Sequence, residues 1–135
     1  MNINIWTDGS CHGNPGPAGS GAVLKSGQYR KEISKSIGIA TNNIAEMSAV
    51  VLALEALKKP AESDVTLYTD SQLVEGLLVR GWKAHANTEL ANHMQALAGR
   101  LKSLKILHVS AHGGDPDNER ADKLANAAAD DKAAQ

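Results

Sequence analysis

Four acidic residues occupy positions from which side chains can form a common site. Asp8 follows the apolar run at residues 3–6, and Asp70 follows the β-branched run at residues 65–69, so each is placed at the end of a predicted strand. Glu46 and Asp122 lie at the borders of the apolar stripes of two predicted helices. Clustered carboxylates of this kind predict a site for two hard divalent cations, because without cations they would not all stay ionised.

Each of these acids also has a simple structural explanation. Asp8 suits a turn, and Asp70 suits a helix cap. Glu46 suits a capping box with Asn43, and Asp122 suits a solvated helix face. The four together favour the cation site, since chemistry in mixed α/β sheets gathers where strands end.

Neutral hydrogen-bonding side chains surround the acidic positions along the chain. Thr41, Asn42 and Asn43 stand where a helix is predicted to begin, and a helix N-terminus offers N–H groups to phosphate. Asn14 and Gln72 add further donors. Such side chains can recognise a ribose 2′-hydroxyl, although caps and turns explain any one of them.

Two residues carry open alternatives. His112 lies in a Gly-rich loop, where a histidine beside a metal site can transfer protons. His93 and His108 are predicted to be structural. Trp82, between basic residues, fits either a core anchor or a contact to a nucleic-acid backbone.

The periodicity of apolar residues predicts the order β-β-β-α-β-α-α-β-α. The predicted strands are 2–7, 19–25, 29–37, 65–69 and 106–109, the predicted helices are 44–57, 71–80, 88–101 and 117–129, and residues 8–17 are predicted to form one loop. The long first helix is expected to be capped by Asn42 or Asn43. This order predicts an α/β domain over residues 1–129, with one mixed sheet and helices against it, and a polar tail at 130–135.

Composition restricts the possible classes of protein. The chain has 135 residues, a net charge of −1 and 42% hydrophobic residues, so it is long enough for one core. The single Cys11 excludes an internal disulfide and a cysteine-based zinc site. The scarcity of aromatics argues against a stacking platform for single strands. The sequence predicts neither a membrane-spanning segment nor a signal peptide, and we expect a monomer in the cytoplasm.

Five motifs follow one another in an order that resembles a known family. They are Thr7-Asp8-Gly9-Ser10-Cys11, Gly13-Asn14-Pro15-Gly16-Pro17, Thr41-Asn42-Asn43 with Glu46, Thr69-Asp70-Ser71-Gln72, and Asn118-Glu119-Arg120-Ala121-Asp122. With His112 before the last of them, the chain resembles the bacterial ribonuclease HI type of the ribonuclease H family from about residue 2 to residue 129.

The resemblance implies the ribonuclease H fold, a five-stranded mixed sheet in the order 3-2-1-4-5. It implies that four acids hold two Mg²⁺ or Mn²⁺ ions and that His112 assists proton transfer or product departure. It also implies hydrolysis of the RNA strand of RNA/DNA hybrids to 5′-phosphate and 3′-hydroxyl ends. The implied metal ligands are Asp8, Glu46, Asp70 and Asp122; the implied substrate contacts are Cys11, Asn14, Asn42, Asn43 and Gln72, with Thr41 at a DNA-strand phosphate.

The chain departs from the family pattern where many members carry a basic protrusion. Residues 72–80 run almost directly into 81–83, and residues 84–87 are not basic. Ile44-Ala45 and Ser110-Ala111 also replace Arg-Met and Lys-Gly pairs that are frequent in relatives. The sequence therefore predicts weaker hybrid binding, with a shallow dependence on salt.

Two other functions compete with the hydrolase. One is a non-catalytic module that binds hybrids, which the intact acids and the missing basic surface argue against. The other is a metal nuclease for DNA junctions or double-stranded RNA, because one fold serves several nucleases. Loss of cleavage in Asp70→Asn tests the first alternative, and competition between substrates tests the second.

Overall fold

The computed structural model describes residues 1–110 and 113–131 of the chain. Its elements follow the predicted order, with one added turn of 3-10 helix at Pro60–Glu62. The strands are β1 (Asn2–Cys11), β2 (Gly16–Ser26), β3 (Tyr29–Ala40), β4 (Asp64–Thr69) and β5 (Ser103–His108). The helices are α1 (Asn42–Glu55), α2 (Gln72–Val79), α3 (Thr88–Gly99) and α4 (Pro116–Ala129).

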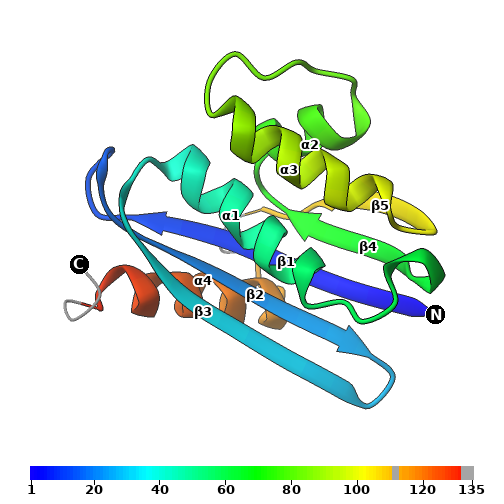
Figure 1. Cartoon of the computed structure of the whole chain (residues 1–135). Helices are drawn as coiled ribbons and strands as arrows, with labels where there is room; N and C mark the ends of the chain where they lie inside the picture. Colours follow the sequence, from blue (N-terminus) through cyan, green and yellow to red (C-terminus); the bar gives the residue numbers. More distant parts are fainter. Residues whose placement is uncertain (111–112, 132–135) are drawn as a thin grey trace.

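The five strands form one sheet in the order β3-β2-β1-β4-β5, which confirms the predicted order (Figure 1). β1, β2 and β3 pair antiparallel, whereas β4 and β5 run parallel to β1. The parallel strands need helical crossovers between them, and α1, α2 and α3 supply these. The carboxyl ends of β1 and β4 consequently meet at one edge of the molecule.

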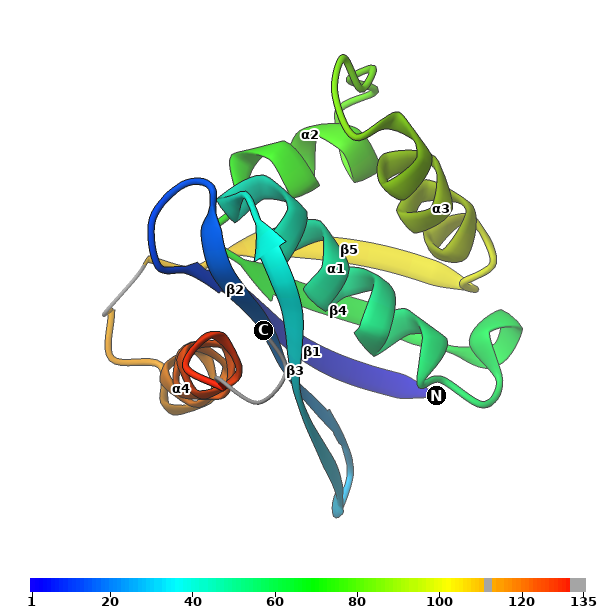
Figure 2. The same ribbon diagram turned by 60° about the vertical axis from the view of Figure 1, so that its left-hand side comes forward.

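The helices lie in two layers on opposite faces of the sheet (Figures 1 and 2). α1, α2 and α3 cover one face, and α4 packs across the other. The alternation of side chains along β1 serves both layers. Ile3 and Ile5 enter the core beneath α1, while Trp6 packs with Val23 and Leu124 beneath α4.

The prediction of one loop over residues 8–17 is wrong. β1 continues to Cys11 and β2 begins at Gly16. Antiparallel pairing of Asp8 with Gly21 and of Cys11 with Ala18 keeps this part of β1 extended. The Gly- and Pro-rich composition suggested a loop, but hydrogen bonds to a neighbouring strand decide the conformation. β3 and β5 are longer than predicted for the same reason.

Side-chain caps fix where the helices begin. The cap of α1 is Thr41, whose Oγ1 accepts a hydrogen bond from the Ile44 N–H at 3.3 Å, and not the predicted Asn42 or Asn43. Ser71 caps α2 in the same way. None of the described helices is both long and apolar enough to cross a membrane.

Residues 80–87 alone join α2 to α3. The Trp82 N–H donates to the Gly76 carbonyl at 3.0 Å, which turns the chain back over α2. A Cβ at Gly76 would lie 2.0 Å from the indole of Trp82, so glycine permits this close packing. The short connection leaves no room for a protrusion between α2 and α3, as the sequence predicts.

Candidate active site

Two neighbouring strands bring Asp8 and Asp70 to the same edge of the sheet. The parallel pairing of β1 with β4 ends at Trp6 and Tyr68, and each aspartate lies two residues further along its chain. The sequence predicted that Asp8 ends the first strand, but β1 continues past Asp8 beside β2. Asp8 stands instead where the pairing with β4 stops, and the predicted approach of the two carboxylates is confirmed.

Glu46 reaches this edge from the second turn of α1. One carboxylate oxygen from each of Asp8, Glu46 and Asp70 lies within 4.8 Å of the others. A Cβ at Gly9 would lie 2.6 Å from the Glu46 backbone nitrogen, so α1 can approach β1 only over a glycine. The buried Ser20 hydroxyl donates to the Ala45 carbonyl at 2.7 Å and fastens this turn of the helix.

Asp122 approaches the same site from the opposite face of the sheet. It lines a cavity of about 220 Å³ together with Asp8, Glu46 and Asp70. Within this cavity it lies beside Asp8, close enough for a side-chain hydrogen bond. All four acids predicted from the sequence therefore converge, three as a tight cluster and the fourth against Asp8.

Burial and crowding favour the protonated forms of two of these acids. Burial, a side-chain hydrogen bond with Asp122 that favours protonated Asp8, and the charge of Asp70 raise the pKa of Asp8 to about 7. Burial and the charges of Asp8 and Asp70 raise the pKa of Glu46 to about 9. A positive charge among the carboxylates would reverse both effects.

The donor set suits a hard divalent cation. Glu46 is only 6% exposed, yet its Oε2 has no hydrogen-bond partner among the described residues. The clustered ligand atoms are all carboxylate oxygens, which Mg²⁺ and Mn²⁺ prefer. Asp8, Glu46, Asp70 and Asp122 are therefore the residues that could hold such ions.

The predicted substrate residues lie around this cavity with different surroundings. Asn14 Oδ1 accepts a hydrogen bond from the Asn42 N–H at 3.0 Å, which joins the β1–β2 turn to the start of α1. Asn42 lines the acidic cavity, and the next residue, Asn43, lines a second cavity of about 440 Å³. Gln72 is exposed at the start of α2.

Thr41 and Cys11 have structural partners of their own. The Thr41 hydroxyl accepts the capping hydrogen bond of α1, so one of its lone pairs is already used. Cys11 is half-buried, and its thiol donates to the Ala40 carbonyl at 3.1 Å. Both residues lie at the junction of β1, β3 and α1, next to the predicted substrate surface.

The predictions for two histidines and for Trp82 have different outcomes. His112 lies outside the described residues, so its predicted role is untested. His93 pairs with Glu55 on the surface, at 3.4 Å. The indole of Trp82 packs against Gly76 and lines the second cavity, yet it is 44% exposed. It thus combines packing with an accessible face.

Sequence reasoning missed two residues that line the acidic cavity, Asn118 and Glu119. Asn118 is buried one turn before Asp122 and donates to the Ser110 carbonyl at 3.4 Å. The available signal was the helical spacing, because residues four apart share a face of α4.

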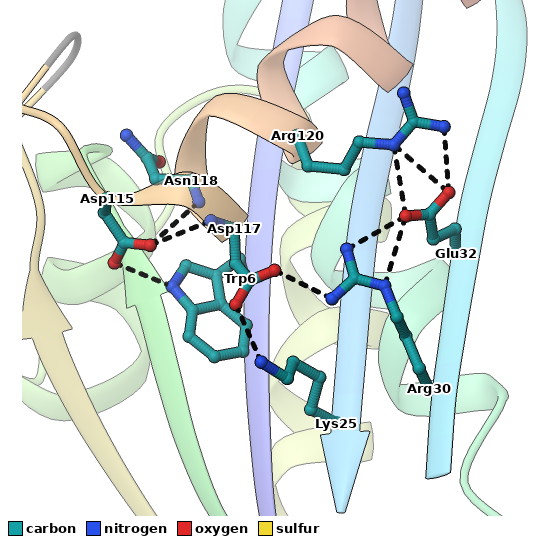
Figure 3. A network of polar contacts seen from close by, with 8 residues as sticks. All are labelled: Trp6, Lys25, Arg30, Glu32, Asp115, Asp117, Asn118 and Arg120. Carbon is teal, nitrogen blue, oxygen red and sulfur yellow. Dashed lines mark hydrogen bonds and ion pairs between the residues drawn. The ribbon is translucent and has the colours of Figure 1, made fainter. Parts of the chain in front are cut away.

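A network of ion pairs fastens α4 to the sheet (Figure 3). Asp117 pairs with Lys25 of β2 at 3.1 Å and with Arg30 of β3 at 2.8 Å. Glu32 of β3 pairs with Arg30 and with Arg120 of α4, at 2.9 Å each. Hydrogen bonds from the two arginines lower the pKa of Glu32 to about 2. The helix that carries Asp122 is therefore held by both β2 and β3.

Comparison with known proteins gives one consistent result. The family model for RNase H matches residues 1–130. A ribonuclease H of Agrobacterium fabrum is 45% identical, over 91% of this chain and 91% of its own. A ribonuclease H of Polaromonas naphthalenivorans is 46% identical, over 93% of this chain and 86% of its own.

Solved structures agree with these relatives. The N-terminal RNase H domain of a Mycobacterium tuberculosis protein has a TM-score of 0.85 at 32% identity, over 96% of this chain and all of its own. LC11-RNase H1 in complex with an RNA/DNA hybrid has a TM-score of 0.78 at 32% identity, over 98% of this chain and 99% of its own. The motifs, the sheet order and these matches together show that the chain belongs to the RNase H family.

Proposed function

We propose that this protein is an endoribonuclease that cleaves the RNA strand of RNA/DNA hybrids. It does so by hydrolysis with two divalent cations, Mg²⁺ in the first place and Mn²⁺ as a substitute, and leaves 5′-phosphate and 3′-hydroxyl ends. The observation that carries the proposal is the buried Glu46 carboxylate, which has an unpartnered oxygen amid two further acids at the edge of the sheet. Membership of the RNase H family supports the reaction class.

The four acids would hold the ions, and each is positioned by a different element. Asp8 and Asp70 come from adjacent strands, Glu46 from α1 and Asp122 from α4. Bound ions would supply a water of lowered pKa and would neutralise the charge that develops on the phosphate. The backbone around Gly9 and the Ser20–Ala45 hydrogen bond keep Glu46 in place for this task.

Hybrid selection would fall to the neutral side chains around the cavity. The Asn14 side chain accepts a hydrogen bond from the backbone N–H of Asn42, and Asn42 lines the acidic cavity. Cys11, Asn43 and Gln72 add to these neutral side chains, and amides of this kind recognise ribose hydroxyls. Thr41, at the N-terminus of α1, would seat a phosphate of the DNA strand. The hybrid complex of LC11-RNase H1, which shares the fold, supports this substrate class.

His112 would move a proton or help the product to leave. It precedes α4 by only a few residues, and the start of α4 lines the acidic cavity. The expected cytoplasmic location and monomeric state stay predictions.

The proposal is tested with one end-labelled RNA offered alone, paired with DNA and paired with RNA. The expected result is cleavage in the DNA-paired form only, in Mg²⁺ or Mn²⁺, with fragments whose 3′ ends a polymerase extends directly. Cleavage of the RNA duplex, or of DNA junctions in competition, would favour the related nuclease. Binding of the hybrid without cleavage in either metal would favour a non-catalytic module.

A further inference from the structure

β1 and α4 run side by side beneath the acidic cavity, and they touch through hydrogen bonds at two points. The Trp6 Nε1–H donates to Asp115 Oδ2 at 3.0 Å (Figure 3). The Ser10 hydroxyl donates to Asn126 Oδ1. We call these two contacts, Trp6–Asp115 and Ser10–Asn126, the flanking pairs.

Asp8 and Asp122 lie along the chain between the flanking pairs, line the same cavity and interact through a side-chain hydrogen bond. Residues 6, 8 and 10 point to one face of β1 at intervals of about 7 Å, because side chains alternate along a strand. Residues 115, 122 and 126 recur along α4 at spacings of seven and four, which places them on one side of the helix. The strand and the helix are thus matched position by position, with the two acids in the middle.

Both partners of the first flanking pair are held rigidly. The Trp6 ring is 7% exposed and stacks on Tyr68, with ring centroids 4.6 Å apart and planes 7° apart. Asp115 uses its other oxygen, Oδ1, to cap α4 by accepting from the N–H groups of Asp117 and Asn118 at 2.9 and 3.2 Å. The hydrogen bond therefore connects a fixed ring on β1 to the first turn of α4.

Close packing leaves α4 little freedom to shift in other directions. A Cβ at Gly21 of β2 would lie 2.4 Å from the Ala121 carbonyl oxygen, and one at Gly19 would lie 2.4 Å from the Ala129 nitrogen. The helix backbone therefore rests directly on the strand backbone. The flanking pairs add a polar contact between α4 and β1 on either side of Asp8 and Asp122.

We propose that the flanking pairs are positioning contacts, which set the separation of Asp8 and Asp122 so that both carboxylates can serve the same cation site. This inference rests on the proposed function, because it assigns a purpose to a contact around the proposed metal ligands. Removal of a group that hydrogen-bonds to a metal ligand and orients it typically weakens metal binding by about 10- to 100-fold.

Two conservative variants remove the first flanking pair without removing its surroundings. Trp6→Phe keeps an aromatic ring against Tyr68 but lacks the N–H donor. Asp115→Asn keeps an oxygen for the helix cap and turns an amide group toward the indole N–H, donor against donor. Asn126→Ala removes the second pair from the helix side.

The readout is the dissociation constant of Mg²⁺, measured by calorimetric titration of the protein without nucleic acid. Each variant is expected to raise this constant about 10-fold, the lower end of the range for groups that hydrogen-bond directly to metal ligands. The double variant Trp6→Phe with Asp115→Asn should raise the dissociation constant by less than the product of the two single fold-changes, since both substitutions act on one hydrogen bond. The matched control is Arg120→Gln, which removes an equally direct contact of α4, to Glu32 of β3, away from the acids.

The outcomes separate this inference from the proposed function. Wild-type Mg²⁺ affinity in Trp6→Phe and Asp115→Asn, with folding verified by circular dichroism, would overturn the positioning role while hybrid cleavage stood. The same loss of affinity in Arg120→Gln would also overturn it, because general loosening of α4 would then explain the effect. Weakened Mg²⁺ binding in a chain whose wild type fails to cleave hybrids would contradict the function and keep the positioning role.

Discussion

At Glu46 a carboxylate oxygen is buried without a hydrogen-bond partner among the described residues. An unpaired buried charge is costly, so this side chain needs either a proton or a cation. In the cation-free protein the proton is favoured, which is why the pKa of Glu46 rises to about 9 and that of Asp8 to about 7. Metal binding at this site should therefore release protons.

The raised pKa values predict how stability depends on pH. Between the ordinary pKa of a carboxyl and the raised value, the folded state binds more protons than the unfolded state, so stability falls as pH rises. In EDTA, the melting temperature should decline from about pH 4.5 toward pH 9, the window that the pKa values of Asp8 and Glu46 define. Mg²⁺ should raise the melting temperature strongly at pH 8.5 and little at pH 5.

The matched variant for this prediction is Glu46→Gln. An amide cannot ionise, so the variant should melt higher than the wild type in EDTA at pH 8.5 and respond less to Mg²⁺. Equal pH profiles for the two proteins, recorded by scanning calorimetry, would mean that Glu46 is not the group responsible.

At the scale of elements, the site depends on how closely helices approach strands. Gly9 lets α1 bring Glu46 to the edge of the sheet, and Gly21 lets α4 bring Asp122 there. A methyl group at either position would meet backbone atoms, which cannot move aside as a flexible side chain does. These two glycines therefore act on the site without being part of its chemistry.

Gly21→Ala tests the approach of α4. The added Cβ would lie 2.4 Å from the Ala121 carbonyl oxygen, so the helix must move outward. Overpacking of this kind costs about 1–3 kcal/mol of the free energy of unfolding, measurable in urea, and Mg²⁺ affinity should fall with it. Gly99→Ala is the control, because nothing lies within 4 Å of its Cβ position. An unchanged free energy of unfolding in Gly21→Ala would contradict the tight contact between β2 and α4.

The ion-pair network makes a separate prediction about acid. Arg120 and Arg30 lower the pKa of Glu32 to about 2, so this carboxylate stabilises the fold above its ordinary pKa and loses that effect as pH falls toward 2. Glu32→Gln should lower the melting temperature at pH 7 in low salt and make little difference at pH 2.5. Glu62→Gln, in an exposed pair with Lys59, should change nothing at either pH.

The order of elements and the four acids were predictable from the sequence, because apolar periodicity and strand ends are local signals. The extent of β1 and β2 was not, since pairing between Cys11 and Ala18 overrides a Gly- and Pro-rich composition. Asn118 was missed as a cavity residue for a related reason. Its helical spacing from Asp122 puts both residues on one face of α4, but only the docking of α4 on the sheet brings that face to the cavity.

At the scale of the whole molecule, charge limits how the chain can hold a nucleic acid. The net charge is −1, and residues 80–87 form only a short connection between α2 and α3. Arg30 and Arg120 are engaged with Glu32 and Asp117, so they are not readily available to phosphates. Affinity for a hybrid should consequently rest on the neutral residues and on the cation site.

Hybrid binding should therefore depend only weakly on salt concentration. With Asp70→Asn to prevent cleavage, the slope of log affinity for a hybrid against log salt should be about 3 or less in magnitude, or about three phosphate contacts. Fluorescence anisotropy at salt concentrations from about 50 to 200 mM gives this slope. Proteins with many phosphate contacts lose most of their affinity over that range. A slope above about 6 in magnitude would instead show that a basic surface of the protein contacts the phosphates.

The role of the clustered carboxylates in RNA-strand cleavage is tested most directly by the cleavage rate in a hybrid, measured for wild type and Asp70→Asn, each before and after addition of Mg²⁺. Cleavage by wild type is expected only after Mg²⁺ is added, and none is expected from Asp70→Asn although it is folded and binds the hybrid. Cleavage by Asp70→Asn at the wild-type rate, or by wild type in EDTA, would contradict the claim that these clustered carboxylates perform the reaction.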